Sequence, residues 1–319
     1  MRTLYIVGNG FDIAHGINTP YADFRKFLEV NAPDFLADFE SMYDIIPLDP
    51  DDWRYTEERQ KNWDKWVQKI LWRNFEDSIG LPDVDSMYSE AEAQVDGMPE
   101  RGVKDTLDYF WKERYKFSEN LQTYVLQWIQ SIDISGVTCK KKCLENDNED
   151  FFLSFNYTET LEKIYGVRKV LHIHGGIPTC TSELPIMGHG NQFLIEDNLR
   201  KAKQYLAEGI EWSASIHEAI AQYAQSIYKD TDKIIQDHDE FFSSLDSIDQ
   251  IICIGISFGD VDIPYLERIE KSIRKDVKWL VYYYDKDGKE RLKNVFGITG
   301  ISRRYETYFI PSTSFWDQE

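Results

Sequence analysis

Two histidines, His172 and His174, stand one residue apart at the end of an apolar run and just before Gly175 and Gly176. In an extended strand, side chains two residues apart share a face, so both imidazoles would point the same way. Imidazole has an unperturbed pKa of roughly 6.5, which suits it to proton transfer near neutral pH. We predict that His174 is a general base and that one of the two histidines is structural. A metal site and a hydrogen-bonded pair at a sheet edge are the alternatives.

Asn156 follows a second apolar run, residues 151–155, and its amide could hydrogen-bond a ribose or a water molecule. A helix is predicted to follow, with Tyr157 and Leu161 on one face. Glu159 lies three residues after Asn156, which is the spacing of a capping box. From this segment alone, a helix N-cap is therefore favoured over a ligand-binding role for Asn156.

Near the N-terminus, the apolar run Leu4–Val7 leads into a glycine turn and a polar loop, before a helix predicted to start at Thr19 and Pro20. Glycines permit a sharp turn and a close approach of backbone N–H groups to a phosphate. The segment lacks the GxGxxG and GxxxxGK[ST] fingerprints, so glycines that serve only the turn are the alternative. The candidate nucleotide-binding residues here are Gly8, Asn9, Gly10, Phe11, Asp12 and His15.

Two later segments also place polar residues beside glycines. In open α/β sheets, ligands bind beyond the carboxyl ends of the strands, which makes polar residues at strand ends functional candidates. Asp262 has a structural alternative as the N-cap of a helix that starts near Ile263. The candidates are Gly188, His189, Gly255, Ser257 and Asp262.

The polar segments need a sheet to position them, and six apolar runs have the character of buried strands. Helical periodicity flanks several of these runs. The alternation predicts an α/β fold: a Rossmann-like, mostly parallel sheet flanked by helices. The predicted strands are 4–7, 151–155, 169–173, 250–254, 277–284 and 305–310.

The long segments between these strands predict helical insertions into the core. Residues 1–30 should form the first strand, turn and helix, and residues 31–149 a helical insertion. Residues 150–319 should complete the core, with a smaller helical insertion near 193–245 ahead of the strand at 250–254. Within the larger insertion, helices are predicted at 60–79 and 106–132. The segment between them that contains Pro82, Gly97, Pro99 and Gly102 is predicted to form connections between helices.

The chain has 319 residues, of which 42% are hydrophobic, and a formal net charge of −20. This charge disfavours binding to nucleic-acid phosphates and to anionic membranes. The cysteines form no CxxC pair; Cys253 is predicted to lie in the core, and Cys139 and Cys143 in a solvated loop. The sequence shows neither a signal-peptide pattern nor an apolar stretch of membrane length, so we expect a cytoplasmic protein with no membrane or nucleic-acid partner.

These motifs resemble those of the AbiH-type phage abortive-infection family, in the same order and over nearly the whole chain. The matching segments are Gly8–Gly16, Ser154–Thr158, His172–Gly175, Gly188–Asn191 and Gly255–Ser257. The family in turn is similar to the sirtuin-like NAD-binding fold. That similarity pairs Asn156 and His174 with the polar catalytic pair of that fold, Gly8 and Gly10 with its first turn, and Gly255 and Ser257 with its last strand end.

Two departures from the sirtuin pattern bear on the activity. Thr158 stands where sirtuins carry aspartate, and the paired CxxC zinc module is absent. The absence of the zinc module argues against protein deacylation. The resemblance therefore implies an anti-phage effector that takes NAD as substrate or ligand and hydrolyses the bond between nicotinamide and ribose.

In this interpretation His174 is the general base, and Asn156 orients the ribose or the attacking water. Phe11 packs on the nicotinamide, Asp12 or His15 fixes the loop around it, and the amides after the two glycines of the first turn hold the pyrophosphate. A nucleotide-binding sensor without turnover and a metal-dependent hydrolase are the alternatives, although no metal is expected. A homo-oligomer and a phage-derived trigger are the partners left open.

Overall fold

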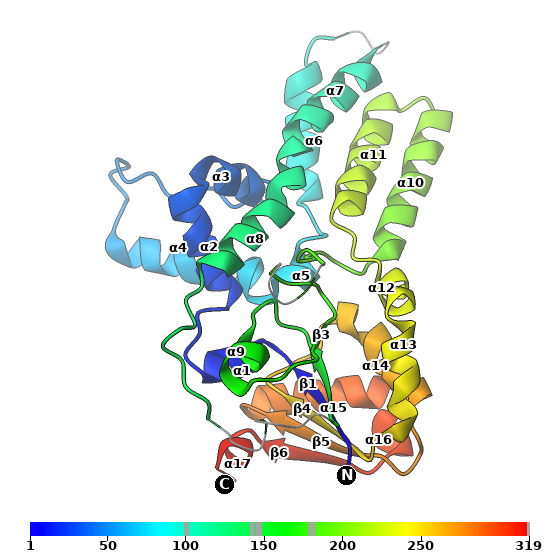
Figure 1. The fold of residues 1–319 in the computed structure, drawn as a ribbon. Helices are drawn as coiled ribbons and strands as arrows, with labels where there is room; N and C mark the ends of the chain where they lie inside the picture. The colour runs from blue at the N-terminus through cyan, green and yellow to red at the C-terminus, as the bar shows by residue number, and fades with distance from the viewer. Residues whose placement is uncertain (99–101, 141–143, 145–148, 178–180, 182, 318–319) are drawn as a thin grey trace. The chain divides into compact units, whose positions relative to one another are not determined.

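The computed structural model describes residues 1–98, 102–140, 144, 149–177, 181 and 183–317 (Figure 1). The chain folds into two compact units, each built from segments that are distant in sequence. The sheet unit comprises Met1–Pro20, Val125–Ile186 and Asp230–Glu319, and the helical unit comprises Tyr21–Tyr124 and Met187–Lys229.

Six parallel strands form the sheet unit's core in the order β3-β2-β1-β4-β5-β6. This order is the one found in dinucleotide-binding folds, in which the strand order reverses between the first and fourth strands. The predicted α/β, Rossmann-like parallel sheet is therefore confirmed. The strands are β1 (Thr3–Val7), β2 (Phe151–Ser154), β3 (Leu171–His172), β4 (Gln250–Ile254), β5 (Lys278–Tyr283) and β6 (Thr307–Pro311).

Helices cover both faces of this sheet. Leu4 and Ile6 of β1 point into an apolar layer that includes residues of α12–α16, whereas Tyr5 and Val7 point into a second layer with residues of α1, α9 and α17. A strand buried on both faces reads as a continuous apolar run, which is why these strands were predictable. The helices are α1 (Asn9–Ala14), α9 (Thr160–Tyr165), α12 (Thr231–Asp237), α13 (Asp239–Ser243), α14 (Ile263–Ser272), α15 (Lys286–Ile298), α16 (Ile301–Arg304) and α17 (Thr313–Trp316).

The helical unit packs around aromatic side chains and a buried ion pair. The Arg25 guanidinium donates to both carboxylate oxygens of Glu40, at 2.7 and 3.0 Å, and the indole N–H of Trp72 donates to the same carboxylate at 2.7 Å. Bidentate pairing of this kind compensates the burial of both charges. The unit's helices are α2 (Tyr21–Asn31), α3 (Pro33–Ser41), α4 (Glu57–Ile70), α5 (Phe75–Ser78), α6 (Val84–Val95), α7 (Val103–Tyr115), α10 (Gln192–Ala207) and α11 (Glu211–Ser226), and α8 (Leu121–Ser131) begins in it.

Three predicted local structures were wrong. Residues 9–14, taken as a polar loop, form α1, because Phe11 and Asp12 are buried and anchor a turn of helix. Residues 84–95, taken as a connection, form α6, which the Asp83 side chain caps by accepting from the Ser86 N–H at 2.7 Å. The helix predicted at 106–132 is divided by a 3₁₀ segment at Lys116–Asn120.

Two further findings concern the cysteines and the membrane. Cys253 is fully buried in the core, as predicted, and Cys139 is half-buried. Cys143 and Pro99 lie outside the described residues. Within the part of the chain that the structure describes, every helix is too short or too polar to cross a membrane.

Candidate functional site

The loops that follow β1 and β4 are in direct backbone contact, beside the two neighbouring strands at which the strand order reverses. The Gly8 N–H donates to Ile254 O at 3.1 Å, and the Gly10 N–H donates to Gly255 O at 2.7 Å. A Cβ added to Gly10 would lie 2.8 Å from Gly255 Cα. The glycines of the first turn are thus required by the approach of a second loop, which is a packing role that the sequence left open.

One of the two amides expected to hold a pyrophosphate, that of Phe11, is engaged within the turn. Besides Gly8 and Gly10, the Phe11 N–H donates to Gly8 O at 2.8 Å. Asn9 instead ties the turn to the segment before α2, since its amide nitrogen donates to Thr19 O at 3.0 Å. Of the amides in this turn, those of Gly8, Gly10 and Phe11 are engaged within the protein.

Phe11 and His15 belong to the core beneath the turn. Phe11 is fully buried, with its ring 5.7 Å from that of Tyr165 and 5.4 Å from that of Trp316. The His15 Nδ1 pairs with Phe11 O at 2.7 Å and the Nε2 with the Tyr165 hydroxyl at 2.7 Å. Burial lowers the pKa of His15, and both ring nitrogens already have partners. The geometry therefore gives both side chains structural contacts.

Asp12 is the most unusual ionisable group at this edge of the sheet. Its side chain is 1% exposed, and the Thr158 hydroxyl donates to its Oδ2 at 2.5 Å. Burial raises the pKa of Asp12 to about 6, although Thr158, Thr160, Asn156 and the nearby His172 favour the charged form. Among the described residues, no donor forms a hydrogen bond of ordinary geometry with Oδ1. A buried carboxyl group is typical of functional sites when its pKa lies near neutrality and one of its oxygens lacks a hydrogen-bond donor.

The raised pKa of Asp12 predicts a pH-dependent stability. Because this pKa is higher in the folded protein than the ordinary 3.8, the proton stabilises the fold at low pH, and that contribution is lost as the pH rises through about 6. Asp12→Asn removes the titration, so the free energy of unfolding of the variant relative to wild type should rise by roughly 3 kcal/mol between pH 4 and pH 8. Urea unfolding of both proteins across this range measures the difference. A constant difference would show that Asp12 does not titrate as described.

Asn156 does not cap a helix. The following helix, α9, begins only at Thr160 with Glu159 at its N-cap position, so the capping interpretation was wrong. A local turn, in which the Asn156 N–H donates to Ser154 Oγ at 3.1 Å, precedes the helix. The Asn156 Nδ2 donates to Gly8 O at 3.1 Å, which joins the ends of β1 and β2. Its Oδ1 is buried and has no hydrogen-bond donor among the described residues.

The two histidines do not share an environment, contrary to the prediction. β3 ends at His172, so the alternation of a strand does not extend to His174. The His172 Nδ1 pairs with Asn156 O at 2.9 Å and its Nε2 with the Glu162 carboxylate at 2.7 Å. His172 is thus a buried link between β3, α9 and the loop that carries Asn156.

His174 faces a different group of residues. Its Nε2 lies 3.7 Å from Asp262 Oδ1, and both side chains are largely buried. The imidazole also packs against the rings of Phe155 and Tyr265, at centroid distances of 5.1 and 5.5 Å. A histidine beside a carboxylate is an arrangement that suits proton transfer.

The loop between β4 and α14 positions Asp262. Asp262 is the residue before α14, as predicted, but its carboxylate accepts from the Gly259 N–H at 2.9 Å and makes no side-chain cap of that helix. Phe258 in the same loop has a φ of +50°, which is rare and strained for a bulky residue. Ser257 is exposed at the surface. The sequence analysis did not predict that Tyr265 and Phe155 lie beside His174. Tyr265 could have been predicted, because it follows Asp262 by three positions and residues at this spacing share a helix face.

The remaining predicted residues, Gly188 and His189, belong to the helical unit. A Cβ on Gly188 would lie 2.0 Å from Ile227 O, so glycine is required there by backbone contact. The His189 Nε2 pairs with Ala224 O at 2.9 Å, and its Nδ1 accepts from the Asn191 N–H at 3.1 Å. Both ring nitrogens of His189 are engaged inside this unit.

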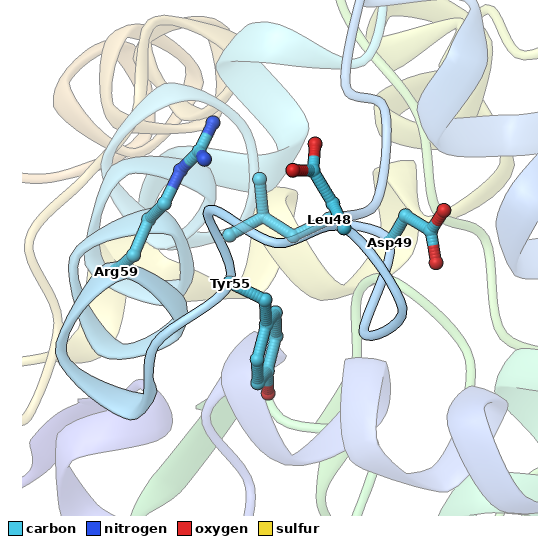
Figure 2. Close-up of a pocket in the computed structure, with 5 residues that line it drawn as sticks. Leu48, Asp49, Tyr55 and Arg59 are labelled. Atoms are coloured by element: carbon cyan, nitrogen blue, oxygen red, sulfur yellow. The ribbon is translucent and has the colours of Figure 1, made fainter.

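The described residues also contain a hollow outside the sheet unit. A small hollow on the helical unit lies beside α4 and the loop before it, and none of the predicted site residues lines it (Figure 2). Its lining residues are Leu48, Asp49, Asp52, Tyr55 and Arg59. Across the described ranges, no three His, Cys, Asp or Glu side chains are grouped as metal ligands would be.

The sequence matches a known protein family. The family model described as "Bacteriophage abortive infection AbiH" matches residues 4–283, which run from the second residue of β1 to the end of β5. No curated protein matches the sequence. The matched range contains every candidate site residue named above.

Proposed function

The chain belongs to the AbiH family of bacteriophage abortive-infection proteins, and we propose that it acts in this defence by binding and hydrolysing NAD or a related nucleotide. Membership of the family implies a role in phage abortive infection. The nucleotide and its cleavage are our proposal, supported by the sheet topology and by the residues at the carboxyl ends of its strands.

The observation that carries the proposal is the His174–Asp262 pair, 3.7 Å apart, at the edge of the sheet where this strand order places nucleotides. His174 follows β3 and Asp262 precedes α14, so the loops of two non-adjacent strands supply the pair. Catalytic hydrogen bonds are often long before substrate binds, and this distance suits a pair that tightens on binding. The motif resemblance to sirtuin-like proteins supports NAD as the nucleotide.

In the proposed reaction, water attacks C1′ of the nicotinamide ribose while the bond from C1′ to the nicotinamide nitrogen breaks. His174 takes the proton that the water loses, and the electron pair of the broken bond leaves with nicotinamide, which becomes neutral. The products are nicotinamide, ADP-ribose and a proton. The transition state resembles an oxocarbenium ion, as in other glycoside cleavages. Asp262 stabilises the imidazolium that forms on His174.

The burial of His174 and Asn156 favours a second candidate function, a nucleotide sensor without turnover. His174 is 4% exposed and Asn156 is 6% exposed, so the described conformation is closed around these side chains. A sensor would bind NAD in the same place and transmit the change without chemistry.

Calorimetric titration of NAD into His174→Gln protein measures binding without turnover. Glutamine fills much of the histidine's volume but cannot act as the base, so we expect saturable binding with one NAD per chain. A second titration with Asn156→Ala should show weaker binding, because this variant removes a proposed ribose contact. The absence of any NAD binding to the folded protein would contradict the proposal. Binding accompanied by no product in the wild type would favour the sensor.

A further inference from the structure

The two ends of the Asn156 amide have different surroundings. The nitrogen donates to Gly8 O at 3.1 Å. The oxygen is buried and lacks a hydrogen-bond donor in the described part of the chain. Gly8 O is an acceptor, so the amide nitrogen must be the atom that faces it. The oxygen is thereby left for a donor that the described residues do not supply.

Asp12 is held so that it can fix this orientation. The Thr158 hydroxyl donates to its Oδ2 at 2.5 Å, which sets the plane of the carboxylate. The Asn156 side chain and the Thr160 hydroxyl lie close enough to stabilise the ionised form. An ionised Asp12 therefore attracts the amide nitrogen of Asn156 and repels its oxygen.

We infer that ionised Asp12 is a positioning residue, which orients the Asn156 amide so that its oxygen accepts a hydrogen bond from a hydroxyl of the nicotinamide ribose. The identity of this ligand rests on the proposed function, whereas the coupling of Asp12 to Asn156 does not. When Asp12 is protonated, its attraction for the amide nitrogen is lost and the bond to Gly8 O alone holds the amide.

Other titratable groups surround Asp12 and must be separated from it. His172 on β3 faces it, and His172 is itself paired with Glu162 on α9. His15, the residue after α1, lies one turn away from Asp12. The loop after β2 contributes the neutral side chains of Asn156 and Thr158, and its one acid, Glu159, pairs with Lys163 on α9. Removal of Asp12 alone therefore identifies its share of any pH dependence.

The coupling is tested by NMR on protein labelled with ¹⁵N-asparagine, with the Asn156 side-chain signal assigned by its loss in Asn156→Ala. We expect this signal to shift with a midpoint near pH 6 in wild type and to lose that shift in Asp12→Asn. The matched control Asp287→Asn, an exposed acid on α15, should keep it. A wild-type signal that does not move between pH 5 and pH 8, or the same shift in Asp12→Asn, would overturn the inference.

The acceptor role is tested with two ligands, NAD and its analogue lacking both hydroxyls of the nicotinamide ribose. In the His174→Gln background, NAD should bind about tenfold more tightly than the analogue, which is the effect of a buried hydrogen bond. With Asn156→Ala added, the two ligands should bind equally. Equal affinities before that change would overturn the acceptor role. If neither ligand binds, the NAD proposal fails, and the NMR titration alone decides the coupling.

Discussion

Replacing His174 by alanine is expected to abolish NAD cleavage, with a loss of about 10²–10⁴ in rate, because the variant removes the general base. The imidazole lies 3.7 Å from Asp262 and packs between Phe155 and Tyr265, so its removal also leaves a gap in the site. Steady-state rates of ADP-ribose formation measure the effect. A rate equal to that of the wild type would remove His174 from the mechanism.

The gap left by alanine requires a control for folding. His174→Gln keeps most of the side-chain volume and lacks a base, so it should lose activity to a similar extent while its melting temperature stays close to that of the wild type. Loss of activity in both variants, with folding retained in the glutamine variant, assigns the effect to chemistry. Activity that is retained in His174→Gln and lost only in the alanine variant would indicate a packing role.

Replacing Gly255 by alanine is expected to produce a large loss of stability in the sheet unit. Gly255 has a φ of +68°, which costs an L-residue roughly 1–2 kcal/mol. Its added Cβ would lie 2.1 Å from Phe11 N and 2.6 Å from Gly10 C, and overpacking of this kind typically costs a further 1–3 kcal/mol. The contact is between two backbones, so no side chain can move to relieve it. Chemical denaturation measures the change in the free energy of unfolding.

Two other glycines separate the contributions to this effect. Gly16 has a φ of +76° but open space around its Cβ position, so Gly16→Ala should show only the backbone cost. Gly297 lies in α15 with open space around it, and alanine there should stabilise the helix by up to about 1 kcal/mol. Equal losses in Gly255→Ala and Gly16→Ala would contradict the close packing of the β1 and β4 loops.

The strands were predictable because a buried parallel strand is a short, continuous apolar run. β4 has the predicted bounds, Gln250–Ile254, and the other five strands lie within about two residues of theirs. The order of the strands depends on contacts between distant residues, and no local pattern encodes it. The same limit applies to the helical unit, in which residues 21–124 and 187–229 pack together.

The candidate site was predictable in composition but less so in geometry. The motifs located Asp12, Asn156, His174 and Asp262 at strand ends, and the structure places all four in the sheet unit. The shared face expected for the two histidines failed because β3 has only two residues. The contact between Asp12 and Thr158 joins residues 146 positions apart, and only the fold brings them together.

The most direct test of the central claim is chromatographic detection of nicotinamide after wild-type protein is incubated with NAD. The proposal predicts that nicotinamide and ADP-ribose accumulate in equal amounts, and that neither forms with His174→Gln. Bound NAD that is recovered intact from the wild-type protein would contradict hydrolysis. Release of nicotinamide at the same rate by both proteins would contradict the site.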